Sequence, residues 1–327
     1  MSVVLAVDGG NSKTYAALVR SDGELLGLAR GGLSSPQHLG IHGSLGVLQG
    51  LREEAGGTKA DVAVLLLAGL DFPEEERRLQ EAVSALGWAD RVVVGNDTFA
   101  VLRAGTERGW GVAVVCGAGI NCVGVSPTGQ HIRFPALGEI SGDWGGGYDL
   151  GLAAVWAAAR SEDGRGPRTS LERIVPAHFG LETPRDLAEA VHLGRVDQRD
   201  VIELPPVLFA AAADDAVAAE IVHRLADEVV TLARAALTRL GLEREPVEVV
   251  LGGGVLQSGD RRLLEAIELG LARVGPALTM RVASSPPIVG SALLGLDELR
   301  AGPETQARLR AELGAAVDRL ETRMEVE

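Results

Sequence analysis

The stretch AVDGGNSKTYAALV, residues 6–19, places an acid, two glycines and a lysine between two apolar runs. A P-loop has the spacing GxxxxGK[ST] and leads into a helix, and a Rossmann fingerprint also requires strand, turn and helix. Here that spacing is absent, and residues 14–19 continue as a strand. Glycines at the end of a strand let backbone N–H groups approach an anion without an intervening Cβ. We therefore predict a phosphate-binding β-hairpin, with an ordinary tight β-turn as the alternative.

The plan of this stretch recurs later in the chain. Residues 110–134, WGVAVVCGAGINCVGVSPTGQHIRF, predict the same series of three strands as residues 3–29, again with a glycine turn after the first strand. A further apolar strand within VEVVLGGGVLQSG, residues 247–259, also runs into glycines. Independent turns need not repeat an arrangement, so a duplicated module with a nucleotide site is favoured over three unrelated turns.

Strands and helices alternate between the two hairpins. Buried strands are predicted at 61–71 and 91–97, with a helix between them that starts near Pro73 and stops at Gly87. A chain of 327 residues exceeds one ordinary core. We expect an α/β fold with an N-terminal lobe at 1–103 and a C-terminal lobe at 104–303. The amphipathic helix at 304–323 is a candidate to return to the first lobe.

Charge and composition exclude several classes of protein. The chain has 45 acidic and 31 basic residues, a net charge of −14, which argues against a nucleic-acid partner. It contains no apolar run of about 18 residues, and its N-terminus lacks signal-peptide features, so we expect a cytoplasmic protein without a membrane partner. Cys116 and Cys122 lie in a strand-like segment and are not spaced as metal ligands, which indicates core packing.

Six segments together carry a resemblance to a known family. They are AVDGGNSKT (6–14), VVVGNDTFAVL (92–102), VAVVCGAGINCVGV (112–125), GEISGDWGGGYDLG (138–151), VVLGGGVLQSG (249–259) and SPPIVGSALLGL (285–296). In this order they resemble the phosphate-1, connecting, phosphate-2, substrate-loop, adenosine and second connecting motifs of the N-acetylglucosamine kinase / BadF-BadG-BcrA-BcrD ATPase family. The resemblance implies two actin-like (ribonuclease H-like) lobes, each a mixed sheet with a three-stranded meander flanked by helices, with a cleft between them.

The family resemblance also implies roles for individual residues. Asp97, delivered to the carboxyl end of a buried strand, would be the general base, unless it only caps the helix near Thr98. Asp8 would hold Mg2+ through water, unless it only caps its turn. Residues expected to bind ATP are Gly9, Gly10, Asn11, Ser12, Lys13, Thr14, Gly117, Ala118, Gly119, Gly253, Gly254 and Gln257.

Sugar contacts are expected from a second group of residues. The group consists of Gln37, Gly69, Asn96, Asn121 and Asp143. Gly145, Gly146 and Gly147 predict a mobile loop that closes on the sugar. Two segments depart from the family pattern, LSSPQHLG (33–40) and PALGEISGD (135–143), so Gln37 or His38 would have to replace the usual sugar contacts.

The expected function is an ATP-dependent kinase acting on N-acetylglucosamine or a related amino sugar or hexose, with C6 as the phosphorylated position and a homodimer as the assembly. Both of these finer expectations come from the resemblance alone. The first alternative is an ATPase that activates a partner protein, disfavoured because Cys116 and Cys122 are not placed to hold an iron–sulfur cluster. The second is a non-catalytic sugar sensor, against which Asp8 and Asp97 count.

Overall fold

The protein contains two five-stranded sheets. The structure is a computed structural model, and it describes residues 1–326. Contacts divide it into two units. The first holds residues 1–113, 125–131 and the chain from 283 onward, and the second holds 114–124 and 132–282. No helix within the described range is long and apolar enough to cross a membrane.

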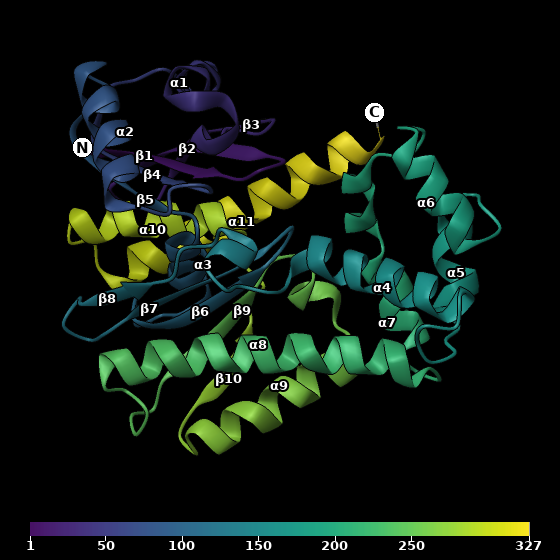
Figure 1. The fold of residues 1–327 in the computed structure, drawn as a ribbon. Helices are drawn as coiled ribbons and strands as arrows, with labels where there is room; N and C mark the ends of the chain where they lie inside the picture. Colours follow the sequence, from purple (N-terminus) through teal and green to yellow (C-terminus); the bar gives the residue numbers. More distant parts are fainter. Residues whose placement is uncertain (327) are drawn as a thin grey trace. The chain divides into compact units, whose positions relative to one another are not determined.

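The first sheet has the strand order β3-β2-β1-β4-β5 (Figure 1). Strands β1 to β3 form an antiparallel meander, and β4 and β5 extend it in parallel from β1. The meander predicted for residues 3–29 is thus confirmed. The strands are β1 (Val3–Gly9), β2 (Thr14–Arg20), β3 (Leu25–Gly31), β4 (Ala60–Leu67) and β5 (Ala89–Asn96).

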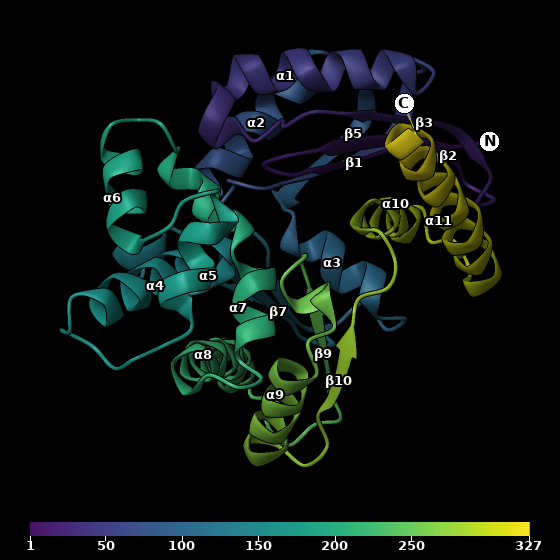
Figure 2. The ribbon, with the colours of Figure 1, turned by 90° about the vertical axis from the view of Figure 1, so that its right-hand side faces the viewer.

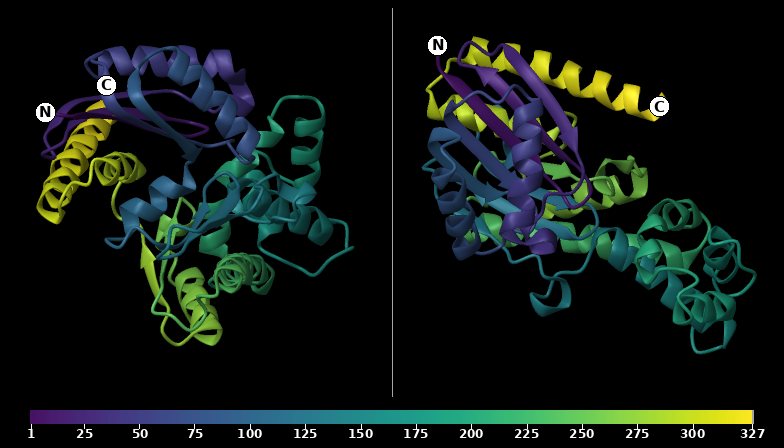
Figure 3. Two further views of the ribbon diagram at one scale, coloured as in Figure 1. Left: turned by 90° about the vertical axis from the view of Figure 1, so that its left-hand side faces the viewer. Right: turned by 90° about the horizontal axis from the view of Figure 1, so that it is seen from above.

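Helices cover both faces of this sheet, as Figure 2 shows. In β1, Leu5 and Val7 face α1 and α2, whereas Val4 and Ala6 face α10 and α11, because successive side chains of a strand point to opposite faces. Figure 3 shows the C-terminal helix (yellow) running along the meander (purple). The helices of this unit are α1 (Pro36–Glu54), α2 (Pro73–Ala85), α3 (Thr98–Gly105), α10 (Pro287–Glu298) and α11 (Pro303–Val326).

Close approach of backbones explains why α10 belongs to the first unit. A Cβ on Gly290 would lie 1.9 Å from the Ala100 carbonyl oxygen in α3, and one on Gly295 would lie 2.2 Å from Val4 Cγ1 in β1. The glycines therefore allow α10 to lie directly on both elements. The range predicted for the second lobe, 104–303, includes α10.

The second sheet repeats the plan of the first. Its order is β8-β7-β6-β9-β10, which matches β3-β2-β1-β4-β5 strand for strand, so the predicted duplication is confirmed. Cys116 and Cys122 are buried free thiols in β6 and β7, as expected of core residues. The strands are β6 (Gly111–Cys116), β7 (Ile120–Val125), β8 (His131–Arg133), β9 (Glu248–Gly252) and β10 (Thr279–Val282).

Helices of the second unit follow local capping signals. The Asp215 side chain accepts hydrogen bonds from the Val217 and Ala218 N–H groups at the start of α8, and Gly241 ends that helix in the left-handed conformation with φ 67°. The unit's helices are α4 (Gly146–Glu162), α5 (Leu171–His178), α6 (Pro184–His192), α7 (Pro205–Ala211), α8 (Ala216–Leu240) and α9 (Arg261–Val274), with short 3-10 helices η1 (Gly138–Ile140), η2 (Gln198–Glu203) and η3 (Leu256–Ser258).

Candidate functional site

The first glycine turn joins β1 to β2 in a tight hairpin. The Gly10 N–H donates to the Lys13 carbonyl oxygen at 2.8 Å, which leaves residues 11–13 exposed at the tip. A Cβ on Gly9 would lie 2.3 Å from Leu67 Cδ2, and one on Gly10 would lie 3.1 Å from the Lys13 carbonyl oxygen. Gly9 therefore serves packing against β4, and the open backbone is that of the tip.

Side chains of this hairpin differ in how far they are available. Thr14 is fully buried, and its hydroxyl donates to the Ser34 hydroxyl at 2.7 Å. Lys13 is half exposed and forms an ion pair with Glu321 of α11 at 3.0 Å. Asn11 and Ser12 are exposed. Of the four non-glycine residues expected to bind ATP here, Thr14 contributes through the fold, and the other three lie at the surface.

Two carboxylates lie at the carboxyl end of the first sheet. Asp8 precedes the last residue of β1, and Asp97 directly follows β5. Burial, reinforced by the charge of Asp97, raises the pKa of Asp8 to about 8, and the charge of Lys13 opposes the increase. Burial and then the charge of Asp71 raise the pKa of Asp97 to about 7. A carboxylate with a pKa near neutrality has the proton affinity of a general base.

Asn96 anchors the segment that carries Asp97. The Asn96 side chain is buried, and its Oδ1 accepts hydrogen bonds from the Thr98 N–H at 3.0 Å and the Thr98 hydroxyl at 2.7 Å. Its Nδ2 donates to the Leu70 carbonyl oxygen and to Asp71 Oδ1, both at 3.3 Å. Asp97 itself makes no side-chain capping bond to α3. Asn96 therefore holds the helix start, while a backbone hydrogen bond from Thr98 to the Asp97 carboxylate opposes part of the increase in the pKa of Asp97.

The donor set around Asp8 fits a magnesium ion. Mg2+ in kinase sites is held by one or two carboxylates together with substrate phosphates and water. Asp8 offers one partly buried carboxylate at the hairpin, and among residues 1–326 no group of three His, Cys, Asp or Glu side chains is arranged to hold a metal. Such a site suits an oxygen-liganded ion that brings most of its ligands with it.

Three glycine segments converge in the second unit. A Cβ on Gly146, which has φ 85°, would lie 2.4 Å from the Ala118 carbonyl oxygen, and one on Gly253, with φ 84°, would lie 2.4 Å from the Cys116 carbonyl oxygen. The Gly147 N–H donates to the Gly117 carbonyl oxygen at 2.8 Å. The start of α4 and the end of β9 thus both rest on the second glycine turn.

This packing corrects one expectation. Gly145, Gly146 and Gly147 are buried, and the last two begin helix α4. They are glycines because backbones meet there, and not because a loop has to move. Ala118 and Gly119, in contrast, are exposed at the tip of their turn.

An apolar pocket of about 250 Å³ lies beside these glycines. Gln257 precedes the lining residue Ser258 in the chain and is exposed. Its backbone N–H donates to the Gly253 carbonyl oxygen at 3.0 Å. The apolar lining of the pocket suits a flat aromatic ring, such as a nucleobase. Its lining residues are Gly117, Gly147, Ile202, Pro205, Pro206, Phe209, Gly254, Val255 and Ser258.

The two polar residues predicted to contact sugar in this unit, Asp143 and Asn121, accept hydrogen bonds from residues close to them in the chain. Asp143 Oδ2 accepts from the Ser141 hydroxyl at 2.7 Å and the Gly138 N–H at 3.0 Å, and Asn121 Oδ1 accepts from the Cys122 N–H at 2.7 Å. Sequence reasoning missed Asp149, whose Oδ2 accepts from the Gly145 N–H at 2.9 Å and whose pKa burial raises. Its place two residues after the glycine run was the available signal.

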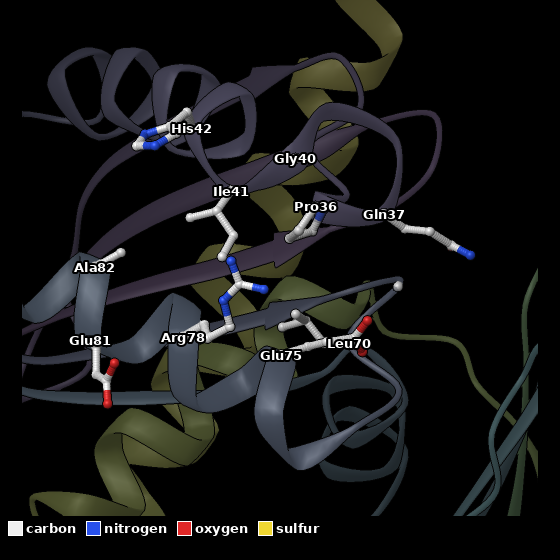
Figure 4. A pocket seen from close by; sticks show the side chains of 11 residues that line it. Pro36, Gln37, Gly40, Ile41, His42, Leu70, Glu75, Arg78, Glu81 and Ala82 are labelled. Carbon is white, nitrogen blue, oxygen red and sulfur yellow. The ribbon is translucent and has the colours of Figure 1, made fainter.

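Gln37 and Gly69 line a second cavity, of about 670 Å³, in the first unit (Figure 4). Gly69 has φ 73°, and a Cβ there would lie 2.6 Å from Ser35 Oγ and 2.8 Å from Gln37 Cβ. The cavity is bounded by the first turns of α1, by the segment after β4 and by α2. Two of the predicted sugar contacts therefore lie together, and the charged residues contributed by α2 were not predicted.

Duplicated sheets, each with a glycine turn after its first strand, define an ATPase and sugar kinase fold of the actin-like class. The chain belongs to the BadF/BadG/BcrA/BcrD ATPase family, whose model matches residues 5–295. Membership of an ATPase family implies the use of ATP.

Individual relatives support this membership. The N-acetylmuramic acid/N-acetylglucosamine kinase of Clostridium acetobutylicum is 28% identical over 265 residues, which cover 79% of this chain and 87% of the relative. The N-acetyl-D-glucosamine kinase of Dictyostelium discoideum is 24% identical over 315 residues, 90% of this chain and 98% of that one. A Chromobacterium violaceum structure named as a candidate N-acetylglucosamine kinase has a TM-score of 0.69 at 24% identity, over 90% of this chain and 99% of that chain, and confirms the fold.

Proposed function

We propose that this protein is an ATP-dependent sugar kinase that phosphorylates N-acetylglucosamine or a closely related amino sugar. The observation that carries the proposal is Asp97, a carboxylate that directly follows β5 at the carboxyl end of the sheet and has a pKa of about 7. The names of the two relatives, both kinases of N-acetylated amino sugars, support the same substrate class.

In the proposed reaction, the Asp97 carboxylate accepts the proton of a sugar hydroxyl as the hydroxyl oxygen forms a bond to the γ-phosphorus of ATP. The bond between that phosphorus and the oxygen bridging to the β-phosphate breaks, and ADP leaves. Phosphoryl transfer asks for positioning and charge neutralisation more than for covalent chemistry from the protein. Mg2+, held at Asp8, would neutralise charge on the β- and γ-phosphates.

Binding roles follow the two units. In the second unit, the apolar pocket beside Gly254 and Val255 would take the adenine ring, and the exposed tip at Ala118 and Gly119 would face phosphate oxygens. In the first unit, the tip at residues 11–13 would face the phosphates, and Gln37 and Gly69 would face the sugar. C6 as the acceptor position, and a homodimer as the assembly, remain proposals that rest on the family resemblance.

An assay of ADP release with ATP, magnesium and a panel of hexoses and amino sugars tests the proposal. We expect ADP release to depend on an N-acetylated amino sugar, and Asp97→Asn to lower kcat by about 10²–10⁴-fold, the contribution typical of general acid–base catalysis. Asp90→Asn, which removes an exposed carboxylate after the start of β5, is the matched control. Equal ADP release with and without sugar would instead support the ATPase alternative.

A further inference from the structure

A single guanidinium points into the 670 Å³ cavity of the first unit. Figure 4 shows Arg78 reaching from α2 towards Ile41, while Glu81 on the same helix points away. The cavity volume falls in the range of small-molecule pockets, roughly 300–1,000 Å³. Ile41 and Gly40 form its upper boundary, where Gly40 (φ 66°, ψ 169°) interrupts the helical conformation of α1.

The acids of this cavity already have partners. Glu75 Oε2 accepts from the Asp71 and Phe72 N–H groups, both at 2.9 Å, as part of the α2 cap. Glu81 is ion-paired with Arg77 at 2.5 Å. Within the part of the chain that the structure describes, the exposed Arg78 side chain has no hydrogen bond or ion pair, and Glu74, four residues before it in α2, is paired with Arg77.

Contacts also connect the cavity to the proposed acceptor site. Leu70 lines the cavity, and its carbonyl oxygen accepts a hydrogen bond from Asn96, the residue that precedes Asp97. Gln37 and Gly69, both expected to contact sugar, line the same cavity. A substituent on a sugar held at Gln37 and Gly69 could therefore extend towards Arg78.

We propose that this cavity is a subsite for a carboxylate-bearing arm of the sugar, with Arg78 as its recognition residue. The inference rests on the proposed sugar kinase function. A guanidinium presents planar donors that match a carboxylate in a bidentate pair. The acid has to sit on a separate arm, because oxidation of the acceptor carbon itself would remove the alcohol that is phosphorylated. An ether-linked acid on an N-acetylated amino sugar, as in N-acetylmuramic acid, meets this requirement.

Steady-state kinetics with three sugars test the subsite. The sugars are N-acetylglucosamine, N-acetylmuramic acid and the methyl ester of N-acetylmuramic acid, whose arm carries no charge. We expect Arg78→Gln to raise the KM for the acid relative to the KM for N-acetylglucosamine by about tenfold or more, as loss of a charge-assisted hydrogen bond would. For the ester, the same variant leaves the ratio unchanged. Arg195→Gln, at an exposed arginine of the second unit that is paired with Glu189, is the matched control and leaves both ratios unchanged.

Two results would overturn the subsite while leaving the kinase intact. They are phosphorylation of N-acetylglucosamine without phosphorylation of the acid, and an equal change in KM for both sugars in Arg78→Gln. If no sugar is phosphorylated, the proposed function itself fails. Titration calorimetry of N-acetylmuramic acid into the wild-type protein and Arg78→Gln then decides the subsite: affinity at least about tenfold weaker in the variant supports it, and equal affinity or no binding rejects it.

Discussion

The Oδ1 atom of Asn96 accepts a hydrogen bond from the Thr98 N–H at 3.0 Å, spanning the residue proposed to be the base. This Asx turn, completed by the Thr98 hydroxyl at 2.7 Å, fixes the backbone on both sides of Asp97. From these bonds we infer a positioning role for Asn96, and the direct sugar contact that the resemblance implied is the alternative. The two roles predict different kinetics.

Asn96→Ala should lower kcat more than it changes the KM for sugar, because Asp97 loses its fixed position while the sugar pocket stays intact. Loss of the two accepted bonds and the two donated bonds should also lower the free energy of unfolding by about 1–3 kcal/mol. Asn96→Asp keeps the accepting oxygen and should recover part of the kcat. Kinetics and denaturant unfolding of both variants check this. A raised KM with unchanged kcat would support the sugar contact instead.

The pKa of Asp97 predicts how activity depends on pH. Burial and the charge of Asp71 raise it from 3.8 to about 7, so the base is protonated at acidic pH and ionised above neutrality. The value of kcat/KM should therefore rise with pH through about 7 and then level off. An unperturbed aspartate would give a midpoint near 4. Initial rates from pH 5 to 9 at saturating ATP and magnesium measure the midpoint, and a flat profile down to pH 5 would rule out Asp97 as the titrating base.

The ion pair between Lys13 and Glu321 gives a third prediction. If Lys13 binds phosphate, it must leave Glu321, to which it is joined at 3.0 Å. Glu321→Gln should then lower the KM for ATP by a few-fold, since an exposed ion pair contributes up to about 1 kcal/mol. Asp318→Asn, the same loss of charge at an exposed position of α11, is the control. A KM for ATP that is equal in all three proteins would mean that Lys13 does not move to the nucleotide.

Short sequence patterns predicted the strands and helix ends that are determined by neighbouring residues in the chain. Alternation in residues 3–29 predicted the meander, and Pro73 and Gly87 predicted the two ends of α2. Position along the chain could not predict that α10 lies on β1 and α3, because that contact depends on Gly290 and Gly295 meeting distant elements. Arg78 escaped prediction for a similar reason. It reads as one more charge on a solvated helix until the partners of Glu75 and Glu81 are known.

Two glycines of the second unit, Gly146 and Gly119, allow an effect on stability to be distinguished from an effect on ATP binding. A Cβ on Gly146 would lie 2.4 Å from the Ala118 carbonyl oxygen, whereas a Cβ on Gly119 meets nothing within 4 Å. Gly146→Ala should therefore destabilise the protein, by about 1–3 kcal/mol for the left-handed backbone and the clash. Gly119→Ala should leave stability unchanged.

Binding should show the reverse contrast. If phosphate oxygens approach the tip at Gly119, the added methyl group should raise the KM for ATP by about tenfold or more while the melting temperature stays constant. Gly50→Ala is the matched control, because Gly50 is at an exposed helical position of α1 where a Cβ also meets nothing within 4 Å. This variant should neither lower the melting temperature nor raise the KM for ATP. Melting curves and ATP titrations of the three variants measure both effects. An unchanged KM for ATP in Gly119→Ala would leave the second glycine turn as a packing element, because nothing else in its surroundings opposes a methyl group.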